Sequence, residues 1–135
     1  MNHYIGVKRV QAEPIEKDGK PGYKVVYEDG YESWSPKDVF EKAYLPINLP
    51  HKLTEEDIDR FVLASVVDTK TINDKLTGVC VTLPNGWIEL EGSACVDPKN
   101  YNAELGKKYC LDRVKEKMWK YLGFVLQWAN NGIKA

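Results

Sequence analysis

The sequence predicts an α+β fold in which antiparallel strands carry helices on one face. Two kinds of pattern lead to this prediction. Short runs rich in β-branched and aromatic residues flank the tight-turn signatures Asp29-Gly30 and Asn85-Gly86. Apolar residues at a spacing of three to four follow helix-capping signatures near Thr54 and Asp97. The predicted order is an N-terminal antiparallel meander and short helix, then a helix, a three-stranded antiparallel meander and a long C-terminal helix.

The N-terminal meander is expected to contain three strands. The first covers Tyr4 to Gln11 and ends at the polar, turn-forming stretch of residues 16–22. Residues 23–27 and 31–34 then form a hairpin around Asp29-Gly30, because both turn residues tolerate a positive φ.

A short helix follows the hairpin. Ser35 is the expected N-cap and Pro36 the first helical residue, and the helix continues to Tyr44. Residues 45–52 contain two prolines and form an extended connector. We therefore divide the chain into an N-terminal part, residues 1–50, and a ligand-binding core, residues 51–135, which together form one compact unit.

The core begins with an amphipathic helix over residues 54–65, opened by Thr54 and the acidic residues after it. Three strands are expected over residues 66–72, 76–83 and 87–95, the last two joined by a turn at Pro84-Asn85-Gly86.

The last element is a long helix that follows the cap-then-proline pair Asp97-Pro98 and stops at Gly132. Gly106 or Gly123 is expected to break it. Aromatic residues are enriched at interfaces, so the end of this helix is a candidate oligomer contact. The aromatic side chains concerned are Trp119, Tyr121, Phe124 and Trp128.

Composition excludes several classes of protein. The chain has 135 residues, of which 43% are hydrophobic and 29% charged, as in globular domains rather than disordered tails. It contains neither an apolar run long enough to span a bilayer nor a secretion signal, so we expect a cytoplasmic protein. The net charge of −1 argues against binding to polymeric nucleic acid. Residues 99–135, however, carry eight basic groups against three acidic ones, a local excess that favours a small anion.

Neither a metal site nor an enzyme is expected. Cys80, Cys95 and Cys110 lack the CxxC spacing and read as buried free thiols, and a zinc site with His3 and His51 is disfavoured. The sequence has no GxGxxG, Walker, HExxH or GxSxG motif, and no cofactor is expected.

The segment from residue 85 to 108 is the strongest candidate for ligand binding. It leads from a strand into a helix N-terminus, whose backbone N–H groups favour an anion, and Trp87 offers a face on which a base can stack. The alternative is an ordinary junction, with Asp97 as a cap and Trp87 in the core. The side chains that could add donors are Ser93, Asn100, Asn102 and Lys108.

Residues 54–126 resemble a family of small phage proteins, some of which are Thoeris anti-defence proteins of the first described type. The N-terminal segments 4–8 and 27–36 also resemble an element that recurs in small phage proteins. The motifs that carry the main resemblance are Asn85-Gly86-Trp87, Ser93-Ala94-Cys95-Val96-Asp97-Pro98, Asn100-Tyr101-Asn102, Glu104 with Gly106 and Lys108, and Trp119.

The resemblance implies a non-enzymatic sponge for glycocyclic ADP-ribose, the signal made by a bacterial TIR-domain defence enzyme. It implies a homo-oligomer, either a dimer or an assembly of dimers, in which the pockets lie between protomers. It further implies that the protein acts in the host cytoplasm. It also implies that cyclic di- or trinucleotides can bind at a separate site. Carried over by position, Trp87 is the stacking surface, Lys108 and Arg113 contact phosphate, and Asn100 and Asp112 make polar contacts.

Each role has a structural alternative: Trp87 as a core residue, Asn100 as a cap, and Asp112 with Arg113 as a solvated pair. Relatives often have a basic residue at the position of Leu111, so the phosphate role here falls more on Arg113 or moves to Lys107.

Two other functions remain open. One is a metal-dependent phosphodiesterase that degrades the signal with Asp97, Glu104 and Asp112, although their spacing along one helix opposes convergence on a metal. The other is a protein-interaction inhibitor of a host enzyme that presents the edge of the hairpin of residues 23–34.

Overall fold

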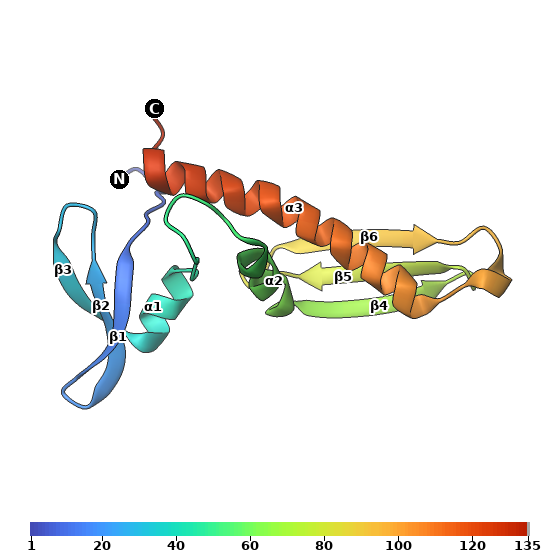
Figure 1. Ribbon diagram of the computed structural model, residues 1–135, viewed down its shortest axis with the longest axis horizontal. Coiled ribbons are helices and arrows are strands. Elements are labelled where there is room, and N and C mark those ends of the chain that lie inside the picture. Colours follow the sequence, from blue (N-terminus) through green and yellow to red (C-terminus); the bar gives the residue numbers. More distant parts are fainter. Residues whose placement is uncertain (135) are drawn as a thin grey trace. The chain divides into compact units, whose positions relative to one another are not determined.

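A computed structural model describes residues 1–134 and has the predicted α+β architecture (Figure 1). These residues form two separate three-stranded antiparallel sheets and three α-helices, with one short 3₁₀ turn. They fall into two compact units. Residues 53–123 form one, and residues 1–52 with residues 124–134 form the other.

The first sheet has the order β1-β2-β3, built from β1 (Gln11–Lys17), β2 (Lys20–Val26) and β3 (Glu32–Pro36). Asp18 and Gly19 alone form the first turn, with φ of 53° and 76°. The predicted strand from Tyr4 to Gln11 is therefore wrong. Gln11 already pairs with Val26, the last residue of β2, so the residues before Gln11 have no partner strand.

Helix α1 (Lys37–Ala43) packs on this sheet through stacked aromatic rings. The ring centroids of Tyr23 and Phe40 lie 4.3 Å apart. The prediction that Ser35 caps this helix is wrong, because Ser35 pairs with Tyr23 in the strand ladder. Pro36 occupies the N-cap position instead, and no side-chain hydrogen bond caps the helix.

Helix α2 (Glu55–Leu63) opens the second unit, and its predicted capping signature is confirmed. Thr54 Oγ1 accepts a hydrogen bond from the Asp57 backbone N–H, and the Thr54 N–H donates to Asp57 Oδ2 at 2.8 Å. Ile58, Phe61 and Val62 on the inner face of the helix are buried.

The second sheet has the order β4-β5-β6, and its three strands lie where the sequence predicts them. They are β4 (Val66–Ile72), β5 (Leu76–Thr82) and β6 (Ile88–Ala94). Alternate residues of β5, namely Thr77, Val79 and Val81, are fully buried.

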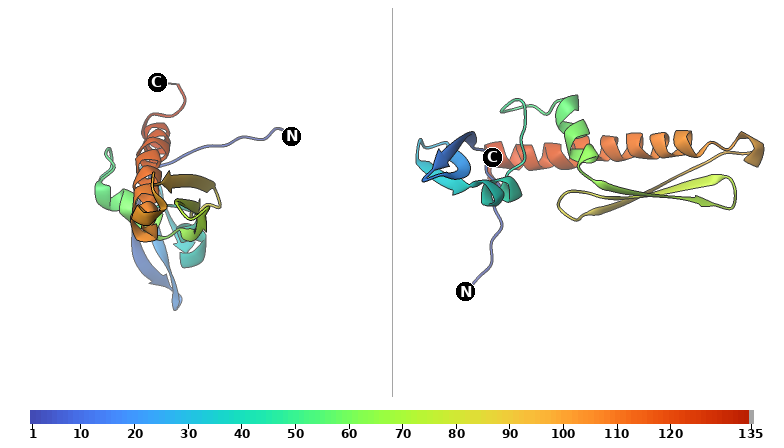
Figure 2. Two further views of the ribbon diagram at one scale, coloured as in Figure 1. Left: turned by 90° about the vertical axis from the view of Figure 1, so that its right-hand side faces the viewer. Right: turned by 90° about the horizontal axis from the view of Figure 1, so that it is seen from below.

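Helix α3 (Ala103–Asn131) runs along one face of this sheet over residues 103–123 (Figures 1 and 2). Its buried residues recur every four positions and face the sheet: Gly106, Cys110, Val114 and Met118.

The expected break at Gly106 or Gly123 is wrong, because α3 is continuous over 29 residues. Gly106 has a packing role instead. A Cβ there would overlap the Thr77 hydroxyl and lie 2.7 Å from Thr77 Cβ. The missing side chain thus allows the helix to lie close to β5.

The start of the long helix also differs from the prediction. Asp97 caps only the 3₁₀ turn Pro98–Asn100, where its side chain accepts from the Lys99 N–H. The side chain of Asn102 accepts from the Leu105 N–H at 3.1 Å, which satisfies a free donor at the start of α3.

The last turns of α3 belong to the first unit and hold two of its irregular segments. Asn130 Oδ1 accepts a hydrogen bond from Arg9 Nε at 2.7 Å, and Asn130 Nδ2 donates to the Pro50 carbonyl oxygen at 3.0 Å. One amide side chain thus connects the N-terminal segment and the 45–52 connector to the helix.

All three cysteines are free thiols, but only Cys110 is buried. The expectation that all three are buried is wrong for Cys80 and Cys95, which are partly exposed. Cys80 alternates with Val79 and Val81 and so lies on the face of β5 away from α3, and Cys95 lies just beyond β6. None of the helices within residues 1–134 combines the length and the apolar character that crossing a bilayer requires.

Candidate functional site

Trp87 follows the Asn85-Gly86 turn and is 59% exposed, so it is not a core residue. The turn fixes its backbone, because the Trp87 N–H donates to Asn85 Oδ1 at 3.1 Å. Its indole Nε1 donates to Glu89 Oε1 at 2.9 Å. An exposed aromatic face is thus combined with a hydrogen bond that restrains the ring.

Glu89 is a buried carboxylate on β6, opposite Val81 and on the face that carries α3. Its Oε1 also accepts from the Tyr121 hydroxyl at 2.7 Å, and its Oε2 accepts from Lys117 Nζ at 3.1 Å. Lys117 contacts Glu91 Oε1 at 2.6 Å as well. We call Trp87, Glu89, Glu91, Lys117 and Tyr121 the Glu89 network.

Charges and hydrogen bonds in this network shift several pKa values. Burial alone would raise the pKa of Glu89, but hydrogen bonds from Tyr121, Trp87 and Lys117 outweigh it and hold the pKa below its usual range. Hydrogen bonds to Glu91 and Glu89 raise the pKa of Lys117. Glu89 and Lys117 are therefore both charged at neutral pH.

The two predicted phosphate-contacting cations both lie on α3 and are exposed. Arg113 Nη1 donates to the Gly92 carbonyl oxygen at 2.5 Å and lies 3.8 Å from Glu91 Oε2. Lys108 Nζ pairs with Asp112 Oδ2 at 3.0 Å, one helical turn away. The solvated pair that involves Asp112 is thus with Lys108 and not with Arg113.

Asn100 lies in the 3₁₀ turn and is exposed, away from the N-cap position of α3. The neighbouring Tyr101 fixes this loop to the sheet, because its hydroxyl lies 2.8 Å from Thr71 Oγ1 and 2.9 Å from Thr77 Oγ1. Both threonines belong to the second sheet.

The structure brings together only part of the predicted set. Trp87 lies at the level of Tyr121 on α3, which is eight residues beyond Arg113 and thirteen beyond Lys108. These intervals correspond to about 12 Å and 20 Å along the helix axis. Lys108, Asp112 and Arg113 share one stretch of α3, whereas Trp87 lies beyond the C-terminal end of that stretch.

Sequence reasoning missed Glu89, Lys117 and Tyr121. The sequence pattern of β6 predicts the opposite for Glu89, because apolar Ile88 and Leu90 alternate with it and are expected to face inward, whereas the structure leaves both exposed and buries Glu89. Lys117 and Tyr121 are four residues apart and thus lie on one face of a helix.

Within residues 1–134, no three His, Cys, Asp or Glu side chains are grouped closely enough to hold a metal ion. Asp97, Glu104 and Asp112 therefore do not form such a group. Asp97 caps the 3₁₀ turn, Glu104 is in the first turn of α3, and Asp112 pairs with Lys108.

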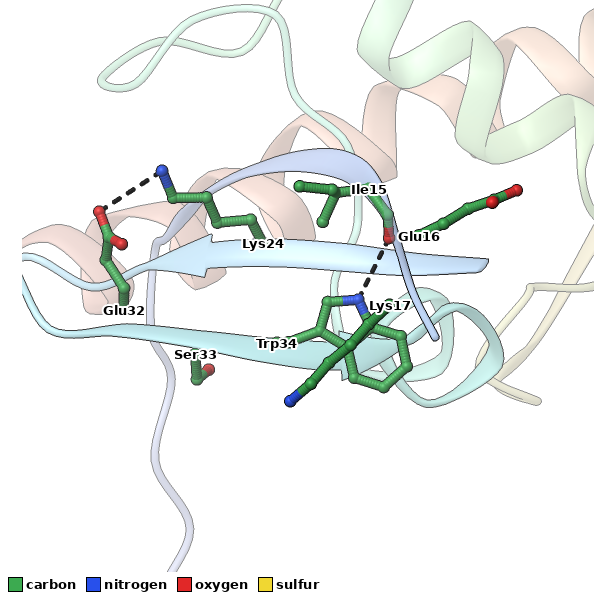
Figure 3. A pocket seen from close by; sticks show the side chains of 7 residues that line it. All are labelled: Ile15, Glu16, Lys17, Lys24, Glu32, Ser33 and Trp34. Carbon is green, nitrogen blue, oxygen red and sulfur yellow. Dashed lines mark hydrogen bonds and ion pairs between the residues drawn. The ribbon is translucent and has the colours of Figure 1, made fainter. Parts of the chain in front are cut away.

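A shallow depression of about 460 Å³ lies on the first sheet (Figure 3). Trp34 Nε1 donates to the Ile15 carbonyl oxygen at 3.1 Å, and Lys17 Nζ lies 5.7 Å from the Trp34 ring centroid. Lys24 pairs with Glu32 at 3.5 Å beside it. None of the five predicted ligand-binding residues lines this depression.

Comparison with known protein families gives one match. Residues 52–129 match the model of the phage protein (N4 Gp49/phage Sf6 gene 66) family. The chain belongs to this family. Comparisons with curated proteins and with solved structures give no match.

The family match contains α2, the second sheet and α3 as far as Ala129. All five predicted ligand-binding residues and the whole Glu89 network therefore lie in the part of the chain that this phage protein family shares. The sheet β1-β2-β3 and α1 lie outside it.

Proposed function

We propose that this phage protein binds glycocyclic ADP-ribose in the bacterial host cytoplasm and sequesters it without degrading it. It would thereby suppress a TIR-domain Thoeris defence. The exposed but restrained indole of Trp87, within the family-matched region, is the observation that carries the proposal. Cyclic di- or trinucleotides are candidate ligands of a second site.

Trp87 suits the adenine part of this ligand. Stacking of a base on an aromatic side chain contributes about 1–3 kcal/mol and needs an accessible ring face. With 59% of the residue exposed, the indole has such a face. Its N–H group donates to Glu89 from the edge of the ring, which leaves the ring face available for stacking.

The cations of α3 suit the pyrophosphate. Exposed ion pairs such as Lys108–Asp112 contribute only about 0–1 kcal/mol, so a doubly charged ligand can compete with them. A guanidinium has five N–H groups in a planar fork, so Arg113 can keep its bond to Gly92 and still contact a phosphate. Asp112 and Asn100 supply acceptors for ribose hydroxyls.

The separation of these groups supports a pocket shared between protomers. About 12–20 Å of helix separates the level of Trp87 from Arg113 and Lys108, which is long for one nucleotide-sized ligand to bridge. A homo-oligomer in which one copy supplies the indole and another the cations removes this difficulty. The binding-competent form is then a dimer or a larger homo-oligomer.

Calorimetric titration with glycocyclic ADP-ribose tests these assignments. Trp87→Ala should weaken binding about 5- to 150-fold, since stacking of a base contributes about 1–3 kcal/mol. Arg113→Ala should weaken it about 12- to 150-fold, since a hydrogen bond between charged groups contributes about 1.5–3 kcal/mol. Lys120→Ala is the matched control, because it removes an exposed cation from the same helix at a position given no role.

Mixing the two defective variants tests the shared pocket. If each pocket combines Trp87 of one copy with Arg113 of another, mixed dimers of Trp87→Ala and Arg113→Ala regain one intact pocket. Each mixed dimer should therefore bind about half as much ligand as a wild-type dimer. No recovery after verified subunit exchange would contradict the shared pocket.

A further inference from the structure

Two hydrogen bonds hold Trp87, one to its backbone and one to its indole, although most of the residue is in contact with solvent. The backbone N–H donates to Asn85 Oδ1 at 3.1 Å, and Nε1 donates to Glu89 Oε1 at 2.9 Å. Exposed side chains usually change rotamer on the picosecond to nanosecond timescale. The second hydrogen bond selects one ring orientation among these rotamers.

The acceptor of this bond is itself buried and held by further hydrogen bonds. Glu89 is 7% exposed and lies within the β6 ladder, paired with Val81 of the central strand. Tyr121 donates to the same Oε1 at 2.7 Å, and Lys117 holds the other carboxylate oxygen at 3.1 Å. Since both donors come from α3, the carboxylate is held between helix and sheet.

The strength of this bond follows from its charge. Hydrogen bonds to an ionised acceptor are about twice as strong as those between neutral groups. The pKa of Glu89 lies below its usual range because Tyr121, Trp87 and Lys117 donate to it, so the carboxylate is charged at neutral pH.

We propose that Glu89 is a positioning residue for ligand binding, which holds the Trp87 indole in the orientation that stacks on the base of the bound nucleotide. This inference rests on the proposed function of the site. Glu89 acts through the indole N–H and does not itself contact the ligand.

The role requires tryptophan in particular. Phenylalanine and tyrosine also offer a ring face, but only the indole carries a ring N–H that can donate to a carboxylate beside the strand. A side chain that is already ordered loses less conformational freedom on binding, and this saving corresponds to about a 2- to 12-fold lower Kd for one rotamer-rich side chain.

A double-mutant cycle on Kd for glycocyclic ADP-ribose tests this mechanism. Glu89→Leu removes the acceptor and should raise Kd about 2- to 12-fold. In a Trp87→Phe background, where no indole N–H exists, the same substitution should change Kd by less than about twofold. Glu89→Gln retains an acceptor oxygen and should restore most of the affinity.

Glu116→Leu is the matched control. It makes the same substitution at an exposed carboxylate of α3 outside the Glu89 network, so Kd should stay near the wild-type value. If Glu89→Leu raises Kd equally in the Trp87 and the Trp87→Phe backgrounds, Glu89 supports only the structure and the positioning role is refuted.

A measurement on the unmodified protein keeps the proposal testable if Glu89→Leu does not fold. The indole ¹⁵N–¹H resonance of Trp87 is the one that disappears in Trp87→Phe. Its order parameter in the ligand-free protein should match the rigid backbone, about 0.85, and a value below about 0.6 would refute the positioning role. If the wild-type protein does not bind the nucleotide, the proposed function is refuted. The order parameter is measured without ligand, so the two failures can be told apart.

Discussion

Replacement of Gly106 by alanine tests how closely α3 must approach the sheet. Gly106 is buried and faces Thr77, a fully buried residue of the central strand. The new Cβ would overlap Thr77 Oγ1 and lie 2.7 Å from Thr77 Cβ. Two carbon atoms rest at about 3.5–4.0 Å, so the helix and strand must separate by about 1 Å.

The expected change in stability is the balance of two terms. Overpacking of this kind costs about 1–3 kcal/mol. Alanine also gains about 0.5–1 kcal/mol over glycine inside a helix, because it loses less backbone entropy on folding. The net loss for Gly106→Ala is therefore about 0–2.5 kcal/mol, with a central value of about 1 kcal/mol. Gly123→Ala, in the same helix, meets nothing within 4 Å and should gain about 0.5–1 kcal/mol.

Urea unfolding followed by far-UV circular dichroism measures both changes. The two variants should shift the free energy of unfolding in opposite directions, and a change of 1 kcal/mol corresponds to about 4–8 °C in Tm for a unit of this size. Equal stabilisation by both substitutions would refute the inference that α3 and β5 need a glycine at their contact.

Three further predictions concern stability and reactivity. Because the folded-state pKa of Glu89 is lowered, its contribution is present above the unfolded-state pKa and lost as pH falls through the folded value. As the pH is lowered past about 4.3, the free energy of unfolding should thus decrease. Urea titrations at several pH values should show a smaller decrease for Glu89→Gln. Cys110 is buried and burial raises its pKa, so a thiol reagent should modify Cys80 and Cys95 first, and equal rates for all three thiols would contradict the packing. Thr54→Ala removes the cap of α2 and should cost about 1 kcal/mol, whereas Thr54→Ser should cost little in the same unfolding assay.

Local signals predicted the elements that depend on neighbouring residues. The capping box at Thr54 and the turn at Asn85-Gly86 each involve side chains within three positions, and both are confirmed. Tyr4 to Val10 shows a partial strand pattern but forms no strand, because a strand also needs a partner and β2 ends opposite Gln11.

Longer-range contacts account for the other differences. Gly106 looks like a helix breaker until Thr77 of β5 is placed beside it, 29 positions earlier in the chain. The position of Trp87 next to a turn was predictable from sequence. Its hydrogen bond to Glu89 was not, because Glu89 is turned inward by contacts with Lys117 and Tyr121, which are 28 and 32 residues away.

The central claim is that the protein holds glycocyclic ADP-ribose without changing it. The direct test is to mix purified protein with the ligand, follow its loss from the free pool, denature the protein and analyse the released material by mass spectrometry. The account predicts depletion in proportion to the protein and stoichiometric return of intact ligand. Release of altered nucleotide would instead indicate an enzyme, and no depletion at all would contradict binding.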